Sequence, residues 1–116
     1  MIDMERNRIL KLSFEFGLLS IRLSKMLRVE KEFVIADQLL RSGTSIGANV
    51  FEAQSPVSKK DFYFKLSLAS KEAYVSWYWL SLIKESEIKL DVSKEIMDVI
   101  ESIVKILNTI LKHRTK

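Results

Sequence analysis

Cysteine is absent from this sequence, and histidine occurs only once. The absence of cysteine excludes disulfide bonds and thiolate metal sites, and it is typical of a chain that works in a reducing cytoplasm. Proline and glycine are also scarce, with one and three residues respectively. This scarcity argues against β-rich folds, which need many turns. The sequence therefore favours an all-α protein of cytoplasmic location.

Long hydrophobic runs are missing as well. The longest stretches without Asp, Glu, Lys or Arg are 42–51 and 73–83, well short of the roughly 20 residues that a membrane-spanning helix needs. Residues 1–8 lack the apolar segment of a signal peptide. We therefore expect a protein that has no contact with a membrane.

The residues that are present have the balance of a globular chain. Hydrophobic residues make up 47% of the sequence and charged residues 29%, which fits one folded domain over residues 1–116. The formal net charge is +4. This mild excess permits contact with nucleic acid or with an acidic protein, but it requires neither.

Apolar residues recur at alternating steps of three and four along most of the chain, which is the spacing of one face of an α-helix. The pattern predicts helices over about 5–28, 33–54 and 59–86, and a fourth helix with Asp91 as its N-cap. The connections between them are short. The sequence therefore predicts an all-α fold, an antiparallel up-down-up-down four-helix bundle.

The second predicted helix contains two glycines, each of which costs roughly 1 kcal/mol relative to alanine inside a helix. Gly43 and Gly47 are four residues apart and share a face, which Ser42 and Ala48 widen. We expect this smooth face to let another helix approach closely and so to offset the cost. A turn at 42–45 is the alternative, but apolar periodicity resumes on both sides and favours a continuous helix.

A polar group lies near the end of the same helix. Asn49 and Glu52 are three residues apart and therefore share a face, with Arg41 and Gln54 close to them in sequence. They would form either a functional polar site or a hydrogen-bonded network that fixes the register of neighbouring helices. The second, structural interpretation is favoured.

Catalytic and metal-binding patterns are missing. Helical bundles that hold metal pairs use Glu-x-x-His motifs, but the single histidine, His113, follows Ile110 by three. The serines occur at helical spacings without a nearby base, as small packing residues do. The sequence therefore predicts no catalytic residue, no cofactor and no metal, and a protein that is not an enzyme.

Basic residues occur in small groups, of which two are candidates for contact with nucleic-acid phosphates. These candidates are Arg22, Lys25 and Arg28 in the first predicted helix, and Lys59 and Lys60 at the start of the third. Acidic residues lie nearby, so an ordinary solvated surface is the alternative. Trp77 and Trp79 would stack on bases, but they point in different directions on a helix, and packing is favoured for at least one of them.

The apolar stripes of the predicted helices are wider than one small bundle needs, which predicts self-association. Segment 41–53 also resembles the signature of the bacterial four-helix bundle proteins called 23S rRNA intervening-sequence proteins. Parts of 58–69 and 71–80 resemble it too, so that the resemblance covers about 33–84. This sequence departs from the family pattern at Val75 and Ser76, where family members often have an acid and a threonine. The resemblance therefore gives no support for a polar network through that position.

This resemblance implies an antiparallel four-helix bundle that assembles into a ring, a homopentamer. A group of similar fold, the accessory variability determinants of diversity-generating retroelements, forms basic pentameric barrels that bind reverse transcriptase and nucleic acid. By analogy, we expect a non-enzymatic homo-oligomer that contacts RNA or DNA through basic helix faces. The alternative is a protein-binding scaffold that has no nucleic-acid role.

Overall fold

The helices form where the apolar periodicity predicts them. In a computed structural model, which describes residues 4–114, α1 spans Met4–Val29, α2 Phe33–Glu52, α3 Lys59–Glu85 and α4 Lys94–Leu111. The predicted ends of the first three helices agree with these bounds to within two residues. The described residues contain no strand, so the all-α prediction is confirmed.

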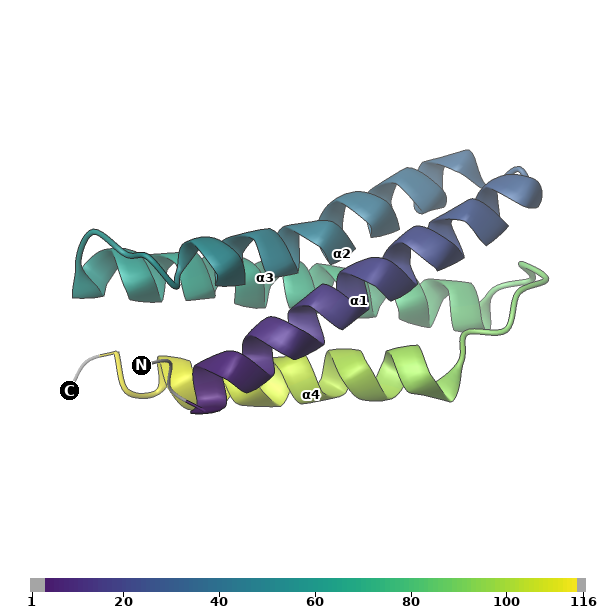
Figure 1. Ribbon diagram of the computed structural model, residues 1–116. Coiled ribbons are helices and arrows are strands. Elements are labelled where there is room, and N and C mark those ends of the chain that lie inside the picture. The colour runs from purple at the N-terminus through teal and green to yellow at the C-terminus, as the bar shows by residue number, and fades with distance from the viewer. Residues whose placement is uncertain (1–3, 115–116) are drawn as a thin grey trace.

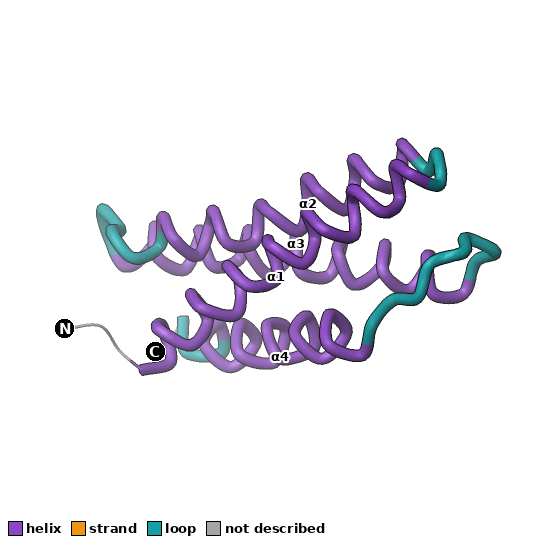
Figure 2. The backbone as a smooth tube through the Cα atoms, turned by 45° about the vertical axis from the view of Figure 1, so that its right-hand side comes forward, coloured by secondary structure: helices purple, strands orange, loops and turns teal. Residues whose placement is uncertain are grey.

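Each helix packs against two others. Among the described residues, α1 and α3 both contact α2 and α4, while the two diagonal pairs are not in contact. Successive helices run in opposite directions. The α2–α3 connection therefore lies at one end of the bundle, beside the start of α1 and the end of α4, and the other two connections lie at the opposite end (Figures 1 and 2). This is the expected antiparallel four-helix bundle, and it is 45 Å long.

Aliphatic side chains fill the space between the helices. Burying one such side chain stabilises the folded state by about 1.5–3 kcal/mol, and α4 alone contributes eight buried residues. The largest fully buried side chains are Ile9, Phe16, Leu27, Leu39, Ile46, Val50, Leu66, Leu80, Ile83, Ile100, Ile103 and Leu107.

The α2 helix continues without interruption through both glycines, and no glycine has a positive φ. The turn alternative at 42–45 is therefore excluded. The tight connection between α1 and α2 instead has Lys31 in the left-handed region, with a φ of 62°. This conformation allows the Lys31 amide to donate to the Arg28 carbonyl and the Glu32 amide to donate to the Leu27 carbonyl, each at 2.9 Å.

Side-chain caps decide where α3 and α4 begin. The Ser58 hydroxyl accepts from the Asp61 amide at 3.0 Å, as a capping residue does. The N-cap predicted for α4 is wrong, because Ser93 and not Asp91 occupies that position. Ser93 Oγ accepts from the Ile96 amide at 3.2 Å. Starting the helix at this point carries Ile96 into the core, where it is buried.

Candidate nucleic-acid interface

The two glycines of α2 lie against α1, where a Cβ atom would clash at Gly43 and would be crowded at Gly47. A Cβ atom at Gly43 would lie 2.1 Å from Ser20 Oγ, and one at Gly47 would lie 3.2 Å from the Ser13 carbonyl oxygen. Ala48 is exposed, so its assignment to this face is wrong. Gly43 and Gly47 therefore bring α1 and α2 close together, and they belong to the scaffold of the surfaces described below.

Charge is distributed unevenly between the two ends of the bundle. Dividing each helix at its midpoint places 8–16, 43–71 and 103–114 in one half, with nine Lys and Arg against three Asp and Glu. We call this half, which contains the α2–α3 connection, the basic end. The opposite half, 17–42 and 72–102, has eight Lys and Arg against ten Asp and Glu. Each end contains two helix N-termini and two C-termini, so side chains and not helix dipoles set the difference.

The predicted nucleic-acid contacts are exposed, but they do not form one surface. Lys59 and Lys60 begin α3 at the basic end, whereas Arg22, Lys25 and Arg28 follow one another along α1 at the opposite end (Figure 1). Arg28 is also engaged within the chain. Its guanidinium forms an ion pair with Asp37 and lies 5.8 Å from the centre of the Phe33 ring. The structure therefore separates the two predicted groups.

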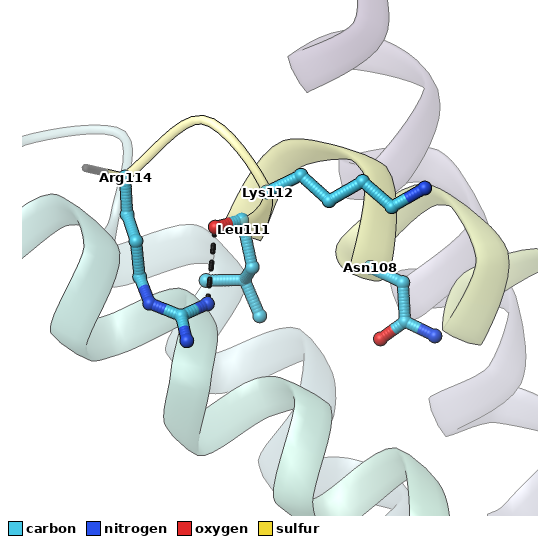
Figure 3. A pocket seen from close by; sticks show the side chains of 4 residues that line it. All are labelled: Asn108, Leu111, Lys112 and Arg114. Atoms are coloured by element: carbon cyan, nitrogen blue, oxygen red, sulfur yellow. Dashed lines mark hydrogen bonds between the residues drawn. The ribbon is translucent and has the colours of Figure 1, made fainter. Parts of the chain in front are cut away.

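A pocket of about 440 Å³ opens at the end of α4, within the basic end. The described residues that line it are Asn108, Leu111, Lys112 and Arg114 (Figure 3). The Arg114 guanidinium donates to the Leu111 carbonyl at 3.0 Å, and the Asn108 amide donates to the Tyr74 hydroxyl at 3.1 Å. The second bond connects this pocket to the surface of α3.

The exposed aromatic residues of α3 are Phe64 and two tyrosines, and not the tryptophans. Trp77 and Trp79 are half-buried and pack against the core, and the Trp79 indole N–H is buried without an acceptor among the described residues. Tyr74 and Tyr78 are 49% and 58% exposed. The Tyr74 ring stacks on Trp77, with 6.5 Å between ring centres and 15° between their planes. A ligand can therefore reach Phe64 near the start of α3 and the two tyrosines near its middle, but not the faces of the tryptophans.

The predicted polar group is not one network, because Arg41, Asn49 and Glu52 form no hydrogen bond or ion pair with one another. Arg41 Nη1 lies 2.8 Å from Glu72 Oε2, and Glu52 Oε1 lies 3.5 Å from Lys65 Nζ. Asn49 donates to a carbonyl of its own helix, one turn earlier. The group therefore consists of two ion pairs that join α2 to α3 and one local hydrogen bond.

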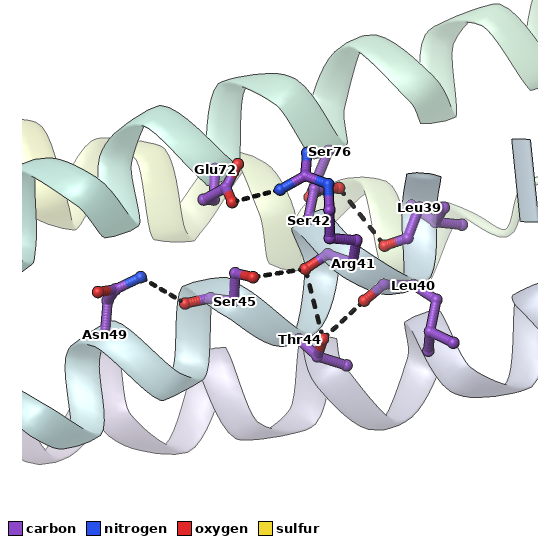
Figure 4. A network of polar contacts seen from close by, with 9 residues as sticks. All are labelled: Leu39, Leu40, Arg41, Ser42, Thr44, Ser45, Asn49, Glu72 and Ser76. Atoms are coloured by element: carbon purple, nitrogen blue, oxygen red, sulfur yellow. Dashed lines mark hydrogen bonds and ion pairs between the residues drawn. The ribbon is translucent and has the colours of Figure 1, made fainter. Parts of the chain in front are cut away.

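A buried hydrogen bond also joins α2 to α3. Ser76 Oγ lies 2.8 Å from Ser42 Oγ, and both serines are fully buried (Figure 4). Sliding one helix along the other would leave the Ser76 hydroxyl without this partner in the core, at a cost of about 1–3 kcal/mol, whereas Ser42 Oγ also lies 3.4 Å from the Leu39 carbonyl oxygen of its own helix. This pair therefore helps to fix the register of α3 on α2, and so the position of the exposed tyrosines.

An apolar surface on α1 and the end of α2 is left largely uncovered by the other described residues. We call it the α1–α2 face, and it consists of Leu10, Phe14, Leu18, Ile21 and Phe51. Phe14 is 68% exposed and Phe51 is 70% exposed. A hollow of about 400 Å³ between α1 and Phe51 is lined mainly by apolar atoms of this face. Gly17 lies one turn from Phe14, and a Cβ atom there would meet nothing within 4 Å.

Within residues 4–114, no three His, Cys, Asp or Glu side chains are grouped so that they could hold a metal ion. None of the described helices has the length and apolarity needed to cross a membrane.

The fold and the charge distribution define a small helical-bundle protein with one basic end. A family model described as 23S rRNA-intervening sequence protein matches residues 5–109, and the chain belongs to this family, as its resemblance predicted. It is similar to a crystal structure of a protein with unknown function from the S23 ribosomal protein family of Bacteroides thetaiotaomicron VPI-5482. The TM-score is 0.84 at 39% identity, over 94% of this chain and 99% of that chain. No functionally curated protein matches the chain.

Proposed function

We propose that this protein is a non-catalytic cytoplasmic homo-oligomer that binds RNA or DNA. The observation that supports nucleic-acid binding is the basic end, with its nine Lys and Arg against three Asp and Glu. Each phosphate that a cation neutralises releases condensed counterions, so cations gathered at one end of a molecule bind a polyanion together. The descriptions of the family and of the related structure refer to 23S rRNA and to a ribosomal protein family, which favours RNA as the first ligand to test.

The α1–α2 face supports self-association. A second copy packed on this face would remove the Phe14 and Phe51 rings from water, which is favourable for each apolar group that is buried. A close approach at Gly17 would also offset the roughly 1 kcal/mol that a glycine costs inside a helix. The assembly proposed is a ring of five, in which this face packs on a different surface of the next copy because a ring needs head-to-tail contacts.

Titration of labelled RNA with the protein, followed by fluorescence anisotropy at several salt concentrations, tests the binding. The logarithm of the association constant should fall linearly with the logarithm of salt concentration, as counterion release requires. If no RNA or DNA binds even at low salt, the proposal is refuted, and the alternative of a protein-binding scaffold that uses the α1–α2 face is favoured.

Sedimentation equilibrium tests the assembly. The expected mass is five times the 13.5 kDa of the chain. If the measured mass is that of a single chain at every protein concentration, self-association is refuted. The proposal of nucleic-acid binding is not affected by that result.

A further inference from the structure

We infer that the surface formed by the middle of α3 and the C-terminal half of α4, next to the basic end, binds single-stranded nucleic acid, with Tyr74 and Tyr78 as stacking platforms for bases. This inference rests on the proposed function and assigns its site and its class of ligand. We call this region the α3–α4 surface. It comprises Lys71, Tyr74 and Tyr78 of α3 and Lys105, Asn108 and Lys112 of α4, together with the pocket at the end of α4.

The two tyrosines are suited to stacking because they are exposed and held in place. They lie four residues apart on one face of α3, about 6 Å along the helix axis. Trp77 supports the Tyr74 ring from one side, and Asn108 donates to its hydroxyl at 3.1 Å. Since that hydroxyl accepts from Asn108, its own proton is available to a base or a phosphate. Bases of a single strand expose their faces to such rings, whereas bases in a duplex are already stacked.

Cations share helix faces with Tyr74 and with its partner Asn108. Lys71 precedes Tyr74 by three residues, and on α4 Lys105 and Lys112 flank Asn108 at helical spacings, so that each shares a face with its neighbour. None of the three lysines forms an ion pair with a described residue. This arrangement of positive charge and aromatic rings is the combination that binds single strands with little sequence preference.

The carboxylates nearest in sequence do not cancel this charge. Glu72, which follows Lys71, pairs with Arg41 on the α2 side, and its side chain is only 13% exposed. Glu101 lies one turn before Lys105 and is half-buried. Beyond Glu101, α4 and the residues that follow it to 114 contain no Asp or Glu. The charge of the α3–α4 surface therefore fits a polyanion.

The candidate group at the opposite end of α1 lacks these features. The Arg28 guanidinium is paired with Asp37 and lies over the Phe33 ring, so the charge and the aromatic ring are already engaged within the chain. We therefore place the nucleic acid on the α3–α4 surface.

Anisotropy titrations of the full chain with a labelled single-stranded oligouridylate test the site. Tyr74→Ala should weaken binding about 5- to 150-fold, which is the effect of removing one stacking platform. Tyr74→Phe keeps the ring and should bind more tightly than Tyr74→Ala, because it loses only the hydrogen bonds of the hydroxyl. Tyr78→Ala, at a more exposed position, provides a second test if Tyr74→Ala disturbs the fold, which circular dichroism would reveal.

A matched pair of charge variants separates this site from the other end of the bundle. Lys105→Glu with Lys112→Glu should weaken binding and reduce the salt slope by about 0.7 for each phosphate that the protein no longer neutralises. Arg22→Glu with Lys25→Glu makes the same change in net charge at the opposite end, and it should leave that slope unchanged.

The outcomes distinguish this inference from the proposed function. If the wild type binds neither RNA nor DNA, the proposed function fails. If it binds but only the Arg22 and Lys25 variant loses affinity, binding stands and the α3–α4 surface is wrong. If a duplex binds as well as a single strand and neither tyrosine variant weakens binding, stacking is refuted. If the tyrosine variants lower the sedimentation mass instead, a second copy of the chain occupies this surface, and the inference is overturned.

Discussion

Replacing Gly43 by alanine would place a methyl group where α1 leaves no room. The added Cβ would lie 2.1 Å from Ser20 Oγ and 2.7 Å from Ser20 Cβ. Rotation of the Ser20 side chain moves its hydroxyl but not its Cβ, which is bonded to the backbone. The buried Phe16 ring lies 3.3 Å from the same point on another side. The two helices would therefore have to move apart to admit the methyl group.

The magnitude follows from two opposing terms. Overpacking a filled interior typically costs about 1–3 kcal/mol, while alanine gains roughly 1 kcal/mol over glycine in a helix. We therefore expect Gly43→Ala to lower the free energy of unfolding by about 1 kcal/mol. Gly17→Ala has the same gain but meets no atom of the chain within 4 Å, so it should stabilise the monomer by about 1 kcal/mol. The same substitution, glycine to alanine, should therefore change the free energy of unfolding in opposite directions on these two neighbouring helices.

Urea unfolding followed by circular dichroism, at a chain concentration low enough to avoid assembly, measures both free energies. Adding Ser20→Gly to Gly43→Ala removes the atoms that clash and should recover part of the stability. This coupling would appear as a non-additive term in a double-mutant cycle. If Gly43→Ala is as stable as the wild type, or if the two changes are simply additive, the contact between α1 and α2 does not limit packing and the reasoning is wrong.

Three further predictions concern local contacts and use the same unfolding assay. Ser93→Ala should lower the free energy of unfolding by about 1 kcal/mol, and Asp91→Ala should lower it by less than about 0.5 kcal/mol. Equal losses would contradict the assignment of Ser93 as the N-cap of α4. Lys31→Gly should raise the stability by about 1 kcal/mol, because a left-handed φ strains a residue that has a Cβ; a lower Tm would contradict this. Glu72→Gln should cost at most about 1 kcal/mol, since its partner Arg41 is half exposed; a larger loss would show a stronger network.

The helices could be predicted from the sequence because apolar spacing alone indicates a helix and its extent. The choice of N-cap could not, since both Asp91 and Ser93 are good capping residues and the packing of Ile96 decides between them. The assignment of Ala48 to the close-packed face is wrong for a related reason. Ala48 follows Gly47 directly, and successive residues on a helix point about 100° apart, so only one of the two can face α1.

The candidate site is harder to predict because it depends on the rotation and register with which the helices pack on one another. Arg41 is close to Asn49 and Glu52 in sequence, yet its partner, Glu72, lies on another helix. Tryptophan is a natural residue for stacking on bases, but the rotation of α3 turns Trp77 toward the core and leaves Tyr74 outside. Helix rotation and register, not residue type, decide which aromatic residue a ligand can reach.

The uneven charge of its two halves gives this 45 Å bundle an electric dipole along its length. In a ring whose copies stand with their long axes along the rotation axis, like ends lie together, so the basic ends would repel one another. Salt screens that repulsion, and rising salt should therefore favour ring formation while it weakens phosphate binding. A polyanion lying across several basic ends would neutralise the same charges. Linkage is reciprocal, so assembly and polyanion binding would then strengthen each other by the same factor.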